Sequence, residues 1–98
     1  MMTQSTSPKR ILVADDDQAV LSSLVKVLED AGYETVFAGD GGEAVELFAI
    51  HRPDLVLLDL NMPGRNGWQA LDSISQIDPL VPIIVITARP NQIGRAHV

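Results

Sequence analysis

Cysteine is absent from the sequence, which excludes disulfide bonds and metal sites built on thiolates. Basic residues are scarce, with 7 Lys and Arg against 13 Asp and Glu, so the formal net charge is -6. This balance argues against nucleic-acid binding by this chain, because such binding uses a basic patch. No apolar run approaches the roughly 18 residues of a membrane span, and no signal peptide is recognisable. We therefore expect a cytoplasmic protein without a membrane segment.

Short apolar runs alternate with segments of helical spacing. The apolar runs predict strands at residues 11–14, 33–38, 55–58 and 83–86. Helical periodicity predicts helices at 18–31, 42–51 and 68–77, and the start of a fourth at 91–98. Trp68 opens the apolar stripe of the third helix, so we expect its side chain to be buried or half-buried. Strands that alternate with helices predict a parallel sheet covered by helices on both faces.

Oxygen-bearing residues follow three of these strands: Asp15, Asp59 and Thr87. In open α/β sheets, ligands bind beyond the carboxyl ends of the strands, so neighbouring first and third strands would bring Asp15, Asp16 and Asp59 together. Two carboxylates ~4 Å apart repel by roughly 4 kcal/mol at an effective dielectric of about 20. Protonation of one carboxyl or binding of a hard cation such as Mg²⁺ relieves this repulsion. A single Asp after a strand is more often a helix cap, and we expect Asp17 to be one.

A second pattern, between Gly39 and Ala44, competes with this interpretation. The segment matches G-x-G-x-x-A after a predicted strand, and Asp59 follows Gly39 by twenty residues. On pattern alone this is a dinucleotide-binding fingerprint. It leaves the acidic strand ends unexplained, and the chain is too short for two mononucleotide-binding halves. The dinucleotide fingerprint is therefore the weaker interpretation, and a turn followed by a helix start explains the segment.

The sequence resembles the receiver domain of two-component response regulators. The resemblance is carried by three segments: Ile-Leu-Val-Ala-Asp-Asp-Asp at 11–17, Leu-Val-Leu-Leu-Asp-Leu-Asn-Met-Pro-Gly at 55–64 with Gly67 after it, and Ile-Val-Ile-Thr-Ala at 84–88. It covers residues 10–90 and implies a flavodoxin-like α/β fold, a three-layer sandwich with parallel strand order 2-1-3-4.

The resemblance also implies a phosphoacceptor and a metal site. Asp59 is expected to accept a phosphoryl group from a sensor histidine kinase or a phosphotransfer protein. Asp15 and Asp16 are expected to bind Mg²⁺ together with Asp59 and the backbone carbonyl of Asn61. The domain is then a signalling switch that assists only its own phosphorylation and dephosphorylation, and not an enzyme with a separate substrate.

Two further residues receive roles from the resemblance. The hydroxyl of Thr87 is expected to move toward the phosphoryl group, and the small side chain of Ala88 to leave room for the phosphate. The conformational output is expected to reach a downstream effector. The alternative is a receiver-like module that binds other proteins without handling phosphate.

One departure from the family concerns its phosphate-binding lysine. The family places this lysine after a fifth strand, whereas the lysines here are Lys9 and Lys26. We therefore expect residues 10–98 to be a receiver domain that is incomplete at its C-terminus, without the fifth strand and fifth helix. The uncharged strand at 83–86 would then be an edge, through which two copies can associate. Residues 1–9, a polar segment with a proline near its end, are expected to be a disordered leader.

Overall fold

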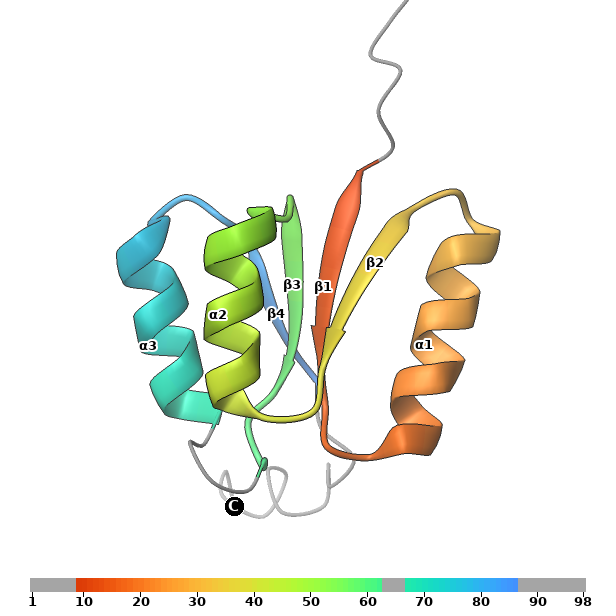
Figure 1. Ribbon diagram of the computed structural model, residues 1–98, viewed down its shortest axis with the longest axis horizontal. Helices are drawn as coiled ribbons and strands as arrows, with labels where there is room; N and C mark the ends of the chain where they lie inside the picture. Colours follow the sequence, from red (N-terminus) through yellow and green to blue (C-terminus); the bar gives the residue numbers. More distant parts are fainter. Residues whose placement is uncertain (1–8, 63–66, 87–98) are drawn as a thin grey trace, which may run out of the picture.

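The computed structural model describes residues 9–62 and 67–86. The described chain forms four parallel strands and three helices. They are β1 (Arg10–Ala14), α1 (Gln18–Asp30), β2 (Glu34–Ala38), α2 (Gly41–His51), β3 (Leu55–Asp59), α3 (Gly67–Ile77) and β4 (Ile83–Ile86). The strand order is β2-β1-β3-β4, with α1 on one face of the sheet and α2 and α3 on the other (Figure 1). The predicted α/β three-layer fold and its strand order are confirmed. Residues 1–8 of the expected leader 1–9 and the helix start at 91–98 lie outside the described residues, whereas the carbonyl of Lys9 accepts from the N–H of Glu34 at 2.8 Å.

The core is divided by the sheet into two apolar layers. Alternate residues of a strand point to opposite faces, and the central strands β1 and β3 are apolar on both. The layer beneath α2 and α3 contains Leu12, Ala14, Val56 and Leu58 from the strands, together with helix residues such as Phe48. The layer beneath α1 contains Ile11, Val13 and Leu21, with Leu24, Leu28, Leu55 and Leu57 packed against them. Both central strands are thereby fixed, and their carboxyl ends are fixed with them.

Local signals explain where the first helix begins and ends. The carboxylate of Asp17 accepts hydrogen bonds from the backbone N–H groups of Ala19 (2.9 Å) and Val20 (3.3 Å), which confirms the predicted N-cap. At the other end, Gly32 has a φ of 98°, a left-handed conformation that suits glycine. No helix in the described part of the chain is long and apolar enough to cross a membrane.

The prediction that Trp68 is buried or half-buried is wrong, because its side chain is 63% exposed. Helix α3 turns Gly67, Ala70 and Ile74 toward the core. Each step of three residues rotates by about 300°, so a stripe read at that spacing drifts by about 60° per step. Two such steps separate Trp68 from Ile74, so the two side chains point in directions roughly 120° apart around the helix axis. Trp68 therefore faces away from the sheet.

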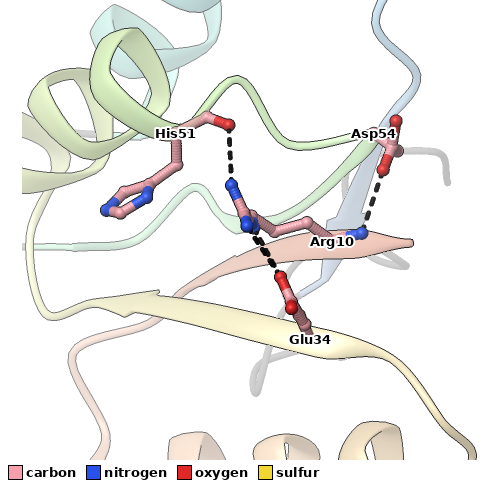
Figure 2. Close-up of polar contacts among 4 residues, drawn as sticks. All are labelled: Arg10, Glu34, His51 and Asp54. Carbon is pink, nitrogen blue, oxygen red and sulfur yellow. Dashed lines mark hydrogen bonds and ion pairs between the residues drawn. The ribbon is translucent and has the colours of Figure 1, made fainter. Parts of the chain in front are cut away.

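Arg10 joins three elements at the amino-terminal end of the sheet (Figure 2). Its guanidinium donates to Glu34 on β2, with an Nη2–Oε1 distance of 2.7 Å, and to the backbone carbonyl of His51 at 3.3 Å. Its backbone N–H donates to the carboxylate of Asp54 at 2.9 Å. The cluster ties β1 to β2 and to the last turn of α2, at the end of the sheet opposite Asp15 and Asp59.

Candidate metal centre at the strand ends

Three carboxylates gather where β1 and β3 end. The two strands are parallel neighbours, and Ala14 is paired with Leu58, so the next residues, Asp15 and Asp59, lie side by side. Both are buried, with exposures of 2% and 4%, whereas Asp16 is exposed. One carboxylate oxygen from each of the three lies within 4.8 Å of the others. The expected convergence of these residues is therefore present in the structure.

The two buried carboxylates are held by the backbone in the same manner. The N–H of Asp17 donates to Oδ1 of Asp15 at 2.9 Å, and the N–H of Asn61 donates to Oδ1 of Asp59 at 2.9 Å. In each case the donor lies two residues after the acceptor, as in an Asx turn. A further bond from the N–H of Asp15 to the carbonyl of Ala38 (3.0 Å) fixes the end of β1 against β2. Sequence reasoning missed this role of Ala38, because a backbone contact leaves no mark on residue type.

The three carboxylates of this cluster carry like charges and repel one another when ionised. Burial raises the pKa of the Asp15 carboxyl above its ordinary value, and the hydrogen bond from the Asp17 backbone partly offsets this. The nearby carboxylates of Asp59 and Asp16 raise the pKa of Asp15 further. Ionisation of Asp15 therefore costs more in the metal-free protein than in a free aspartate, and a cation among the three carboxylates would relieve that cost.

The donor set fits a hard divalent cation. It consists of carboxylate oxygens, which Mg²⁺ prefers, and their spacing of at most 4.8 Å lets one ion contact all three. Burial of two of them on rigid strand ends limits how far they can move apart. Among the other residues expected at the site, Asn61 is exposed and adjoins the cluster through its N–H. Thr87 and Ala88 lie outside the described residues.

Comparison with known proteins supplies the family. The model of the response regulator receiver domain matches residues 11–97. The chain belongs to this family. It is 45% identical over 82 residues to the transcriptional regulatory protein PdtaR of Mycobacterium tuberculosis. The matched region covers 83% of this chain and 40% of PdtaR. It is also 43% identical over 89 residues to the transcriptional regulatory protein PrrA of Mycobacterium bovis. That matched region covers 91% of this chain and 38% of PrrA. This chain therefore spans about two fifths of the length of these curated relatives.

Solved structures share the fold of this receiver domain. One is a chain of the CheX-CheY-BeF3-Mg+2 complex from Borrelia burgdorferi, with a TM-score of 0.79, 30% identity, and coverage of 84% of this chain and 63% of that chain. Another is a CheY-like receiver domain protein from Methanospirillum hungatei, with a TM-score of 0.80 and 31% identity. The match covers 93% of this chain and 75% of that chain. The fold is thus the flavodoxin-like fold of CheY-like receiver domains.

The glycine-rich segment at 39–44 has a local role in this receiver domain. Asp40 caps α2 by accepting from the N–H of Glu43 at 2.8 Å, and the carboxylate of Glu43 accepts from the N–H of Gly39 at 2.8 Å. This reciprocal arrangement resembles a capping box, except that the Glu43 carboxylate accepts from the residue before the N-cap. Two carboxylates therefore stand where a dinucleotide would place its pyrophosphate, which disfavours the dinucleotide-binding alternative.

Proposed function

We propose that Asp59 accepts a phosphoryl group from a sensor histidine kinase or a phosphotransfer protein, beside a Mg²⁺ ion bound by Asp15, Asp16 and Asp59. The observation that carries the proposal is the set of three carboxylate oxygens within 4.8 Å of one another at the ends of neighbouring strands. Further support comes from the structural relative whose name includes BeF3 and Mg+2. A bound Mg²⁺ would neutralise negative charge on the carboxylates and on the phosphoryl oxygens.

The chemical step is the transfer of a phosphoryl group between two side chains. A carboxylate oxygen of Asp59 attacks the phosphorus of a phosphohistidine, and an O–P bond forms while the P–N bond breaks. The electron pair of the broken bond stays on the imidazole nitrogen, which takes up a proton. The products are an aspartyl phosphate and a free histidine. The domain assists this step and the later hydrolysis by positioning Asp59, and it has no separate substrate.

The chain's own contribution is to hold the acceptor still. The Asn61 N–H fixes one oxygen of Asp59, and burial at the end of β3 restricts the rest of the side chain. We assign the backbone carbonyl of Asn61 to the metal shell in this proposal. For the output we assign Thr87 as the switch hydroxyl, with Ala88 leaving space for the phosphate. The strand register supports the assignment of Thr87, because Ile86, the residue before it, is paired with Asp59.

Metal titration with a matched control tests the proposal. Isothermal titration calorimetry with Mg²⁺ is expected to show one site in the natural chain and a large loss of affinity in Asp59→Asn. Asp40→Asn is the control, since it removes one acidic charge outside the cluster and keeps a good helix cap. Incubation with acetyl phosphate is expected to add one phosphoryl group to the natural chain and to Asp40→Asn but not to Asp59→Asn, as read by intact mass.

The same titration separates the other functions. A chain that binds neither Mg²⁺ nor a phosphoryl group, but still binds protein partners, would be a phosphate-independent interaction module. Binding of a nicotinamide nucleotide would revive the dinucleotide-binding alternative. The first result would refute phosphoryl acceptance on Asp59, and nucleotide binding would refute it where acetyl phosphate also leaves the chain unmodified.

We also propose that two copies of this chain associate through β4. Among the described strands, β4 has β3 on one side and no strand on the other. Ile84 and Val85 are 51% and 43% exposed, and the strand carries no charge that would oppose pairing. Val85→Lys, which places a charge on the edge, is expected to keep the chain monomeric at concentrations at which the natural chain dimerises in sedimentation experiments. A natural chain that stays monomeric would refute this association.

A further inference from the structure

Gly67 makes an unusually close backbone contact with the end of β3. It is the first residue of α3, it is buried, and its N–H donates to the carbonyl of Leu60 at 3.3 Å. A Cβ built on Gly67 would overlap the Cα of Leu60 and the carbonyl oxygen of Asp59, and it would lie 2.8 Å from the carbonyl carbon of Leu60. All three atoms belong to the backbone, so no side-chain rotation can relieve the overlap. Any larger residue must therefore move α3 or the peptide that follows Asp59.

That peptide lies directly before the group that orients Asp59. Leu60 separates Asp59 from Asn61, and the N–H of Asn61 donates to Oδ1 of Asp59 at 2.9 Å. Displacement of the Leu60 backbone moves this N–H, and the carboxylate turns with it. The contact of Gly67 thus reaches the carboxylate through one peptide and one hydrogen bond.

The backbone bonds that hold Asp15 have no such dependence. Its carboxylate accepts from the N–H of Asp17, and the N–H of Asp15 donates to Ala38 on β2. Neither of these bonds involves Gly67 or Leu60. A change at Gly67 should therefore act on the Asp59 carboxylate directly, and on Asp15 only through its contact with Asp59.

We propose that Gly67 is a positioning residue for Asp59, whose missing side chain lets α3 set the orientation of that carboxylate toward Asp15 and Asp16. The inference rests on the proposed function for its consequence, since the orientation matters for metal binding and phosphoryl acceptance. The orientation itself can be observed without metal.

The test is Gly67→Ala, with Gly42→Ala as the matched control. Gly42 also lies in the first turn of a helix, but a Cβ there would meet only the flexible carboxylate of Asp40 at 3.4 Å. In amide NMR spectra of the metal-free protein, Gly67→Ala is expected to shift the Asn61 amide strongly and the Asp17 amide little. Gly42→Ala is expected to shift neither. Calorimetric Mg²⁺ affinity is expected to fall about tenfold or more in Gly67→Ala, as is typical when a group that orients a metal ligand is lost.

Four outcomes would overturn the inference. They are an unmoved Asn61 amide, equal shifts of the Asn61 and Asp17 amides, natural Mg²⁺ affinity in Gly67→Ala, and a Gly67→Ala chain that stays unfolded even in a stabilising osmolyte such as trimethylamine N-oxide. In the last case the glycine would maintain the whole fold and not the site. If the natural chain itself binds no Mg²⁺, the proposed function fails, and the metal-free amide shifts alone then decide the role of Gly67.

Discussion

Asp15 and Asp59 lie side by side at the ends of β1 and β3, and each accepts a hydrogen bond at 2.9 Å from the backbone N–H two residues further along the chain. The fold thereby holds two like charges close together in a buried place. Two carboxylates within 4.8 Å repel by ~3–4 kcal/mol at an effective dielectric near 20. When both are ionised, the arrangement therefore costs stability in the metal-free protein, and a bound cation would relieve that cost.

Removing one of these charges should stabilise the metal-free fold. Asp15→Asn keeps an oxygen that can accept from the Asp17 N–H and removes the buried charge. We expect its free energy of unfolding in chelator to exceed that of the natural chain by about 1–3 kcal/mol. Asp16→Asn should give a smaller gain, because Asp16 is exposed and its charge is screened by water. Both should bind Mg²⁺ more weakly.

Urea unfolding in chelator, followed by circular dichroism, measures both gains. An Asp15→Asn chain less stable than the natural one would contradict the repulsion argument. So would a larger gain from Asp16→Asn than from Asp15→Asn.

The pH dependence of stability should follow the raised pKa of Asp15. Since the folded state holds this proton more tightly than the unfolded state does, Asp15 contributes most stability below the ordinary Asp pKa of about 3.9. The contribution is lost as the pH rises from there through the raised pKa in the folded protein. The difference in stability between Asp15→Asn and the natural chain should therefore grow with pH and then level off.

Comparing the two chains cancels the titration of the groups that do not interact with Asp15. The measurement is the difference in urea midpoint at several pH values without metal. A difference that is constant with pH, or that shrinks as the pH rises, would show that burial does not raise the Asp15 pKa. Saturating Mg²⁺ should favour the natural chain at neutral pH, because only that chain keeps all three carboxylates.

The convergence of the acidic residues could be predicted because it depends on strand order alone. Apolar runs marked β1 and β3, and the residues after two neighbouring parallel strands must meet at one edge of the sheet. The exposure of Trp68 could not be read in the same way, since a three-residue spacing fits the helical face only over short distances. The contact of Gly67 with the Asp59 carbonyl could not be predicted, because it depends on how the backbone between β3 and α3 folds back and not on residue type.

The Arg10 cluster was also beyond sequence reasoning. Its partners, Glu34, His51 and Asp54, are separated from it by more than twenty residues, and nothing in their types pairs them. Only the parallel register, in which Arg10 faces Glu34, brings the charges together. The strand topology thus lets these surface charges join β1 to β2 and to the end of α2.

Arg10→Ala should destabilise the fold by about 1 kcal/mol. The half-exposed ion pair with Glu34 is worth ~0.2–1 kcal/mol, and the bond to the His51 carbonyl adds to it. Mg²⁺ affinity should not change, because the cluster lies at the opposite end of the sheet. Lys26→Ala is the control, since its ion pair with Asp30 is largely exposed and bridges a single helix turn. Equal effects of the two substitutions in thermal unfolding would argue that Arg10 contributes no more than an ordinary surface charge.

Gly32→Ala should destabilise the chain through the backbone alone. Gly32 follows α1 in a Schellman motif, in which the N–H of Tyr33 donates to the Leu28 carbonyl and the N–H of Gly32 to the Glu29 carbonyl, both at 3.0 Å. A Cβ at this position would meet nothing within 4 Å, so packing is not the cause of any loss. The cost is that of placing an L-residue at a φ of 98°, about 1–2 kcal/mol, or a melting temperature lower by roughly 4–16 °C.

Two companion substitutions separate backbone strain from other effects at Gly32. Gly32→Asn should lose less stability than Gly32→Ala, because asparagine tolerates the left-handed region better. Gly39→Ala is the control, since Gly39 is not in that region and a Cβ there would meet only the Glu43 carboxylate at 3.9 Å. Its melting temperature should stay close to that of the natural chain. Two results would contradict a dependence of the end of α1 on the left-handed glycine. One is a melting temperature of Gly32→Ala equal to that of the natural chain, and the other is a larger loss of stability in Gly32→Asn than in Gly32→Ala.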